Sequence, residues 1–146
     1  MKKDLKNNIA TVLLKEPVDA VHTDVASNIL DTASCYGIEV DAIIGALTGV
    51  DASNYVTPVL QESNTIVGTD FTTVAATDII GGFSAVNSAT LDSVIQRAGY
   101  IGHKRYVRVL FDYTGTAITA GIVGAVGIIG IPKDAPVSAP APIAAT

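Results

Sequence analysis

The side chains from which catalytic and metal sites are built are scarce in this chain. Its 146 residues include one cysteine, two histidines and no tryptophan. A single cysteine, Cys35, cannot form an internal disulfide, and it implies neither a metal site nor an oxidising compartment. Nucleophilic hydrolysis requires a serine or cysteine held by a base, and His22 and His103 are the only histidines available. The sequence therefore predicts a protein that is not an enzyme, with no catalytic residue, metal or cofactor.

Charge is also scarce, and it is segregated along the chain. Charged residues make up only 16% of the sequence, and no lysine or arginine occurs from residue 16 to residue 96, a span with eleven acidic residues. Four of the nine cations are Arg97, Lys104, Arg105 and Arg108. This segregation suits packing against other copies or a partner of opposite pattern, whereas the alternative is that the cations pair with the chain's own carboxylates. The low charge favours an oligomer whose subunits cover apolar surface.

Two patterns resemble ligand-binding motifs without meeting their requirements. The glycines at 121, 124, 127 and 130 lie inside one apolar segment, without the following helix and later acid of a dinucleotide site. The block from Arg97 to Arg108 could bind nucleic acid, but the sequence pI of 4.7 opposes contact with phosphates. The apolar run 117–131 is too short and too glycine-rich for a membrane span, and the first residues, in which Asn7 and Asn8 follow the lysines, show no signal peptide pattern. We expect no nucleic-acid, membrane or small-molecule partner.

Alternation of apolar and polar residues predicts strands. In 106–113, four apolar side chains share one face while Arg108 and Asp112 share the other, so Arg108 should point outward. Residues 36–44 alternate in the same way, with Glu39 and Asp41 on the polar face. Pro58 makes 55–62 an edge or bulged strand, because proline cannot donate to a ladder. Residues 63–89 resemble a long loop with one helical turn at 75–80, held by a neighbouring subunit.

These segments predict an all-β protein, either an antiparallel β-sandwich or a jelly-roll-like barrel, with extended N- and C-terminal arms. Residues 1–20 should form an N-terminal arm with a short strand at most, and 21–131 a single β domain in which 117–131 returns antiparallel to 106–113. Residues 132–146 should form a Pro/Ala-rich C-terminal arm that lies over a neighbour, since its prolines prevent regular structure.

Three segments of the chain together resemble a known group of proteins. Tyr100-Ile-Gly-His-Lys-Arg-Tyr-Val-Arg-Val109 is followed by Gly124-Ala-Val-Gly-Ile-Ile-Gly-Ile-Pro-Lys-Asp-Ala-Pro-Val137, and the chain opens Met1-Lys-Lys-Asp-Leu-Lys-Asn-Asn-Ile9. With these segments the chain resembles small virion proteins encoded among the head genes of tailed bacteriophages, which share such an opening, a central acidic β region, the Tyr-x-Gly-x-Lys-Arg-Tyr-Val-Arg block and a Pro-x-x-Ala-Pro-Val ending. The resemblance spans nearly the full length and departs after Val137, where the tail continues.

The resemblance implies a capsid decoration (cement) protein that stabilises the head lattice through subunit contacts and arm exchange. The implied partners are other copies of the chain, for example in a trimer, and the major capsid protein. The implied location is the capsid surface, after synthesis in the host cytoplasm. The candidate interface residues are Arg97, Lys104, Arg105, Arg108, Pro132, Pro136, Pro140 and Pro142.

Two other functions stay open. A tail or head-tail junction component would share the same virion resemblance. A ligand- or carbohydrate-binding β-sandwich module belongs to a different class, and the 5% aromatic content and absent tryptophan are unfavourable for it.

Overall fold

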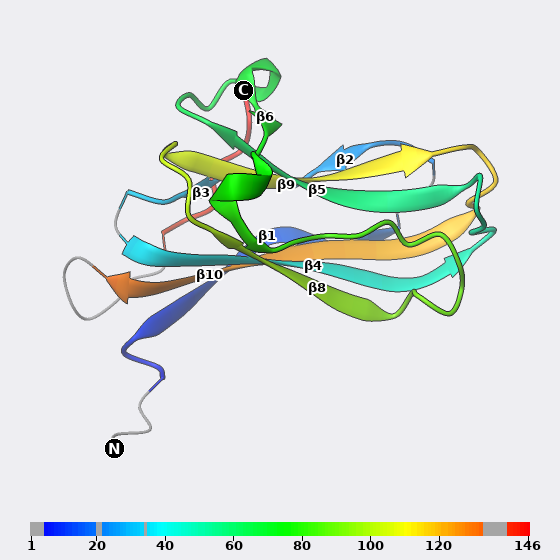
Figure 1. Cartoon of the computed structure of the whole chain (residues 1–146), viewed down its shortest axis with the longest axis horizontal. Helices are drawn as coiled ribbons and strands as arrows, with labels where there is room; N and C mark the ends of the chain where they lie inside the picture. Colours follow the sequence, from blue (N-terminus) through cyan, green and yellow to red (C-terminus); the bar gives the residue numbers. More distant parts are fainter. Residues whose placement is uncertain (1–4, 20–21, 34, 133–139) are drawn as a thin grey trace.

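A computed structural model describes residues 5–19, 22–33, 35–132 and 140–146. The described chain is an antiparallel β-sandwich of two packed sheets (Figure 1). This confirms the predicted all-β class and the sandwich, while the sheets stay open at their edges and do not close into a barrel. No helix of the described residues has the length and apolar character needed to cross a membrane.

Sheet A has the strand order β1-β10-β4-β8-β7. Its strands are β1 (Ile9–Asp19), β10 (Ala120–Pro132), β4 (Cys35–Thr48), β8 (Val94–Tyr100) and β7 (Ile79–Gly81). The longest pairings join β10 to its neighbours β1 and β4, and every neighbouring pair is antiparallel. Sheet A is therefore built around a pair of long central strands, β10 and β4.

Sheet B has the order β2-β9-β5-β6, with β3 also pairing with β9. Its strands are β2 (Val25–Ala26), β3 (Leu30–Asp31), β9 (Tyr106–Thr114), β5 (Tyr55–Ser63) and β6 (Thr72–Thr73). Two 3-10 helices, Gly68–Asp70 and Ala76–Asp78, lie in the segment that links β5 to β7. The second one falls within the predicted helical turn at 75–80.

The core lies between the two sheets and contains the apolar side chains that alternate along β9 and β4. Val107, Val109 and Phe111 in β9 are fully buried, and they face Val40 and Ile44 of β4 across the space between the sheets. Burying each such side chain contributes about 1.5–3 kcal/mol to folding. The inward faces of β9 and β4 are thus as the sequence predicted, except that Tyr36, at the start of the predicted 36–44 strand, is 70% exposed.

Pro58 also lies where predicted. It pairs with Phe111 in the register of β5 and β9. Val56, two residues earlier, exchanges backbone hydrogen bonds with Val86, so the amide positions of Val56 and Pro58 face away from β9. β6 reaches only Gln61 and Glu62 of β5. The proline nitrogen therefore faces the edge of the sheet, where no donor is required.

The N-terminal arm prediction is wrong from residue 9 onward. β1 pairs with β10 along most of its length, and its Val12 and Leu14 belong to the core. Two register shifts, on either side of Lys15, interrupt the alternation. A bulge moves later side chains to the other face, so the strand did not show a period of two in the sequence.

Three other expectations are corrected. Residues 120–132 pair with β1 and β4 in sheet A, so they cross between sheets and do not return along β9. The segment 63–89 packs on its own domain, burying Phe71, Val74 and Val86. Residues 140–146 also lie on their own domain, where Ile143 bridges Ile29. Pro136 and the rest of 133–139 lie outside the described residues.

Candidate functional site

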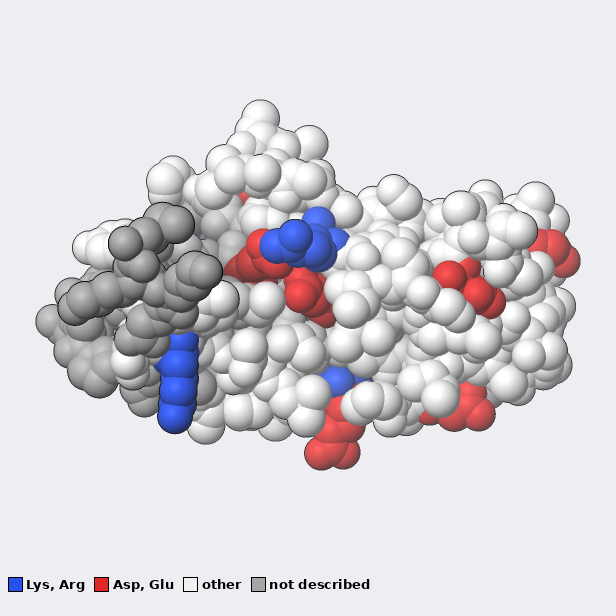
Figure 2. Space-filling view, turned by 90° about the horizontal axis from the view of Figure 1, so that it is seen from below, with Lys and Arg blue, Asp and Glu red and all other residues white. Residues whose placement is uncertain are grey.

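The outer face of sheet A is largely apolar. In register, Leu13 pairs with Val126, and Ile43 pairs with Ile95, all on the face that points away from the core. We call this surface the apolar face. Its members are Leu13, Ile43, Ile80, Ile95, Ile122, Val126 and Ile128. Leu13, Ile80, Ile95 and Ile122 are each about half exposed or more. Figure 2, seen from below Figure 1, shows this side as mostly uncharged with isolated patches of charge.

Several outward positions of sheet A are glycines. Gly124 stands opposite Ile43, and Gly130 stands opposite Gly37. Gly99 stands opposite Glu39 and beside Ile80. These positions are filled from within the chain, since a Cβ at Gly124 would meet the Lys15 carbonyl at 3.3 Å and one at Gly99 would meet Ile80 at 3.4 Å. The outward glycines of sheet A therefore let neighbouring segments of the same chain pack closely against β10 and β8.

One ion cluster crosses the apolar face. The Arg97 guanidinium donates two hydrogen bonds to Glu39, at 2.7 and 2.8 Å, and lies 3.9 Å from Asp41 Oδ1. That Oδ1 atom is buried without a hydrogen-bond partner, since 3.9 Å is an ion-pair distance and too long for a hydrogen bond. Burial, then the neighbouring Glu39, raises the pKa of Asp41. The hydrogen bonds from Arg97 to Glu39 satisfy that carboxylate within the chain.

Lys104 and Arg105, in the turn between β8 and β9, are also paired with acidic residues. Arg105 donates to both oxygens of Asp31, at 2.7 Å from Nη2, and its guanidinium stacks 5.0 Å above the Tyr106 ring. The bond to Arg105 lowers the pKa of Asp31. Lys104 Nζ lies 3.5 Å from Glu62 and 3.2 Å from the Thr72 hydroxyl. Lys104 and Arg105 thus follow the alternative given above, in which the cations pair with carboxylates of the same chain.

Arg108 is on the outer face of sheet B, as its register predicted, but it does not point into solvent. Only 9% of the residue is exposed. Its guanidinium stacks 4.2 Å from the Phe71 ring and donates to Gln61 Oε1 at 2.9 Å and to the Gly68 carbonyl at 3.0 Å. Burial lowers the pKa of Arg108. The outward face of Arg108 is therefore as predicted, but the side chain is buried, because residues 68–71 fold over it.

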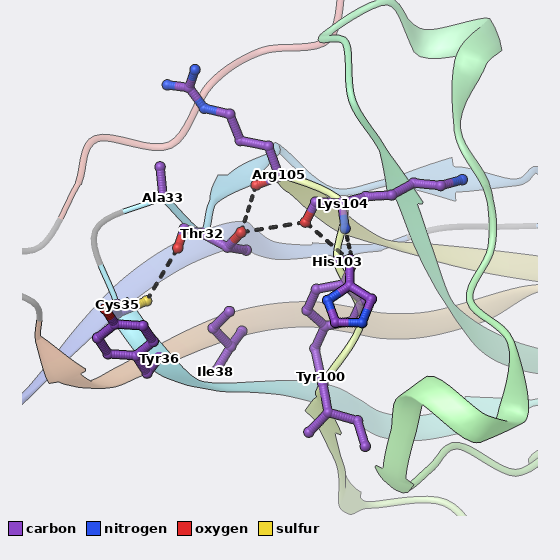
Figure 3. A pocket seen from close by; sticks show the side chains of 11 residues that line it. Thr32, Ala33, Cys35, Tyr36, Ile38, Tyr100, His103, Lys104 and Arg105 are labelled. Carbon is purple, nitrogen blue, oxygen red and sulfur yellow. Dashed lines mark hydrogen bonds between the residues drawn. The ribbon is translucent and has the colours of Figure 1, made fainter.

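A groove lies at the end of the sandwich where β8 turns into β9. Its volume is about 480 Å³, and it is lined by residues of 32–38 and of 100–105, including Tyr36, Ile38, Tyr100 and His103 (Figure 3). The Lys104 and Arg105 side chains extend in opposite directions from the turn. The polar lining includes the Thr32 hydroxyl, which donates to the Arg105 carbonyl at 2.8 Å, and the basic residues His103, Lys104 and Arg105. Because Lys104 and Arg105 are already paired with Glu62 and Asp31, the groove suits an uncharged ligand.

Gly102 shapes the groove. A Cβ atom on Gly102 would lie 2.6 Å from the Tyr100 ring, closer than any tolerated contact. The ring is held because the Tyr100 hydroxyl donates to Glu62 at 2.7 Å and accepts from the Lys104 amide at 2.9 Å. Burial, then the bond to Glu62, raises the pKa of Tyr100. The Tyr-x-Gly spacing in the sequence thus fixes the turn that carries the basic block.

The predicted interface residues are not gathered at one place. Arg97 lies on the apolar face, whereas Arg108 lies on the opposite side of the sandwich, in sheet B. Pro132 ends β10 and pairs with Cys35. Pro140 and Pro142 lie in the segment that packs near Ile29. The sequence analysis selected basic residues and prolines as interface candidates, and it did not predict the apolar face.

The described residues show how the potential metal ligands and His22 are arranged. No group of three or more His, Cys, Asp or Glu side chains among them could hold a metal ion. The His22 ring shares a hydrogen bond with the Ile118 carbonyl at 2.9 Å, which orients it structurally. No family model and no curated protein matches the chain.

Proposed function

We propose that the chain is a non-enzymatic structural protein of a tailed-phage particle, a head decoration protein that lies on the major capsid protein through the apolar face. The observation that carries the proposal is that four large apolar side chains, each about half exposed or more, share one sheet face, because grouped exposed apolar surface marks an interaction site. The sequence resemblance to phage head proteins supports the choice of partner. The low total charge supports an oligomer on the shell.

The proposal assigns affinity to apolar contact and only a minor role to charge. Arg97, Lys104 and Arg105 already have acidic partners within the chain. Such charges steer or orient a partner less than free ones. Binding to the particle should therefore change little between low and moderate salt, since screening weakens exposed charge pairs and leaves apolar burial intact.

Ile95→Glu tests the proposal directly. Ile95 is 58% exposed on the apolar face, so the variant should keep its melting temperature and lose occupancy on purified particles. Val67→Glu is the matched control, because Val67 is 41% exposed but lies in the 63–71 segment on the other side of the sandwich. Occupancy that falls equally for both variants, or for neither, would contradict docking through the apolar face.

A second candidate function is a ligand-binding module, which the groove beside β8 and β9 favours. Tyr36 is 70% exposed at its edge and offers an aromatic surface. Titration with a panel of neutral oligosaccharides, followed by the amide signals of residues 100–105, tests this function. Saturable shifts that Tyr36→Ala removes would favour it, and flat titrations would reject it.

A further inference from the structure

Two segments connect the two sheets along the same side of the sandwich. The first leaves β6, contains the 3-10 helix Ala76–Asp78 and leads into β7 (Figure 1). The second leaves β7 and reaches the edge of β5, where Val86 bridges Val56. A pocket of about 230 Å³, which we call the side pocket, lies between these segments and is lined by residues of β5, β6, β7 and β8 together with Gly82 and Phe83. It shares no lining residue with the groove at the β8–β9 turn.

The Pro58 carbonyl points into the gap between the two segments. At the edge of β5 that faces away from β9, the Val56 carbonyl accepts from the Val86 amide at 2.8 Å. Four residues later, the Leu60 carbonyl accepts from the Val74 amide at 3.0 Å. Carbonyls two residues apart on a strand point to the same edge, so that of Pro58 lies between these two hydrogen bonds. Among the described residues, no backbone hydrogen bond at this edge reaches it. Pro58 is buried and lines the side pocket, so its carbonyl is an acceptor for a ligand there.

The segment that closes one side of the side pocket is held at three points. The Gly82 amide donates to the Arg97 carbonyl at 3.2 Å. The Gln96 side chain accepts from the Ser84 amide at 2.6 Å and donates to the Ser84 carbonyl at 3.0 Å. Further along, Val86 exchanges two backbone hydrogen bonds with β5. Phe83 lies within this fixed segment, so the side pocket is formed before a ligand arrives.

The lining of the side pocket determines which ligand it suits. The lining residues include no charged side chain, and their hydroxyls belong to Thr57 and Thr73. Ile79 and Phe83 pack against the core, and Ala98 is fully buried. An apolar cavity of about 150 Å³ is large enough for benzene, whereas drug-sized ligands need about 300 Å³ or more. The side pocket therefore has room for one aromatic ring with a small substituent.

We propose that the side pocket binds a small neutral molecule with one aromatic ring and one hydrogen-bond donor, of the class of the phenols. The ring lies beside Phe83 and Ala98, where aromatic and aliphatic contacts replace water. The donor supplies the Pro58 carbonyl with the hydrogen bond that the described backbone does not give it. This inference rests on neither the apolar face nor a place on a phage particle, so its test is independent of the proposed function.

Titration of the isotope-labelled chain with p-cresol, toluene and 4-methylcyclohexanol tests the site by nuclear magnetic resonance. The three molecules are similar in size and differ in the donor or in the ring. p-Cresol should give saturable shifts at Phe83, Ala98 and the Pro58 carbonyl carbon, in the millimolar range expected of so small a ligand. Toluene donates no hydrogen bond, so it should bind about two- to tenfold more weakly and leave the Pro58 carbonyl carbon unshifted. The saturated alcohol should also bind more weakly than p-cresol, since it loses the aromatic contact with Phe83.

Thr73→Trp tests the location of the site. Thr73 is exposed and lines the side pocket, so a large side chain there should fill the pocket, keep the melting temperature and abolish the shifts with p-cresol. Thr11→Trp is the matched control, since Thr11 is also exposed but lies on β1, at the opposite edge of sheet A from β7. The control should bind p-cresol as the unmodified chain does.

Three outcomes overturn the inference. Shifts with p-cresol that do not saturate show that the side pocket is not a binding site. Equal binding of p-cresol and toluene shows that the Pro58 carbonyl takes no part in recognition. Binding that Thr73→Trp leaves unchanged shows that the ligand lies elsewhere. The comparison of the three ligands uses the unmodified chain, so it decides the matter even where a variant is unstable.

Discussion

The Tyr100 hydroxyl of sheet A donates a 2.7 Å hydrogen bond to the Glu62 carboxylate of sheet B. Both side chains point into the space between the sheets, where 3% of Tyr100 and 7% of Glu62 are exposed. Lys104 Nζ, at 3.5 Å, is the cation beside this carboxylate. The sandwich is therefore joined at this end by a polar contact as well as by apolar packing.

Tyr100→Phe should destabilise the fold by about 1–3 kcal/mol, because a buried carboxylate loses a donor that water cannot replace. Tyr36→Phe is the matched control, since Tyr36 is 70% exposed. Urea unfolding at neutral pH measures both free energies. Equal stability of the Tyr100 and Tyr36 variants would show that the contact with Glu62 adds nothing.

Tyr113→Phe should leave stability unchanged or raise it. The Tyr113 hydroxyl is buried without a hydrogen-bond partner, so removing it relieves a desolvation cost. Burial, then Asp19, raises the pKa of Tyr113 from 10.0 to about 12. The unfolded chain loses this proton first, so the stability due to the raised pKa is present below pH 10 and is lost as pH rises towards 12. Between pH 9 and pH 12, the free energy of unfolding should therefore fall less steeply for the variant than for the unmodified chain. Equal slopes would contradict the raised pKa of Tyr113.

Arg108→Ala should cost about 2–4 kcal/mol, because it removes the contact with Phe71 and two charge-assisted hydrogen bonds and leaves a gap under residues 68–71. Arg97→Ala should change the free energy of unfolding much less, since the Arg97 side chain is 68% exposed and solvent screens its pair. Thermal and urea unfolding of the two variants give the comparison. A larger loss for Arg97 would reverse the roles assigned to them.

Gly102→Ala should destabilise the β8–β9 turn by about 1–3 kcal/mol, because the added methyl meets the anchored Tyr100 ring at 2.6 Å. Gly130→Ala is the matched control, since its Cβ would meet Ile9 at an ordinary 3.5 Å. Melting temperatures distinguish the two. A Gly102 variant as stable as the Gly130 variant would mean that the turn can move away from the ring.

The sequence predicted the strands whose two faces differ. In β9 and β4, apolar side chains alternate with charged ones, so the period of two shows both the strand and its inward face. Pro58 was located for a similar reason, because a missing amide can only be tolerated at an edge. Local chemistry alone determines these features.

Features that depend on contacts distant in the chain could not be predicted. β10 is apolar on both faces, so its pattern does not show that Ile122, Val126 and Ile128 lie outside. Arg108 has the pattern of an exposed residue, and only the return of Phe71 from another segment covers it. Tyr100 and Glu62 are 38 residues apart, and nothing near either one signals the pair. The site therefore required the tertiary structure.

Cryo-electron microscopy of the purified particle that carries this chain tests the central proposal most directly. We expect density for the sandwich on the outer surface of the head, with Leu13, Ile95 and Ile122 of the apolar face turned towards the capsid protein. A head without this density, or a sandwich bound with sheet B against the shell, would contradict it.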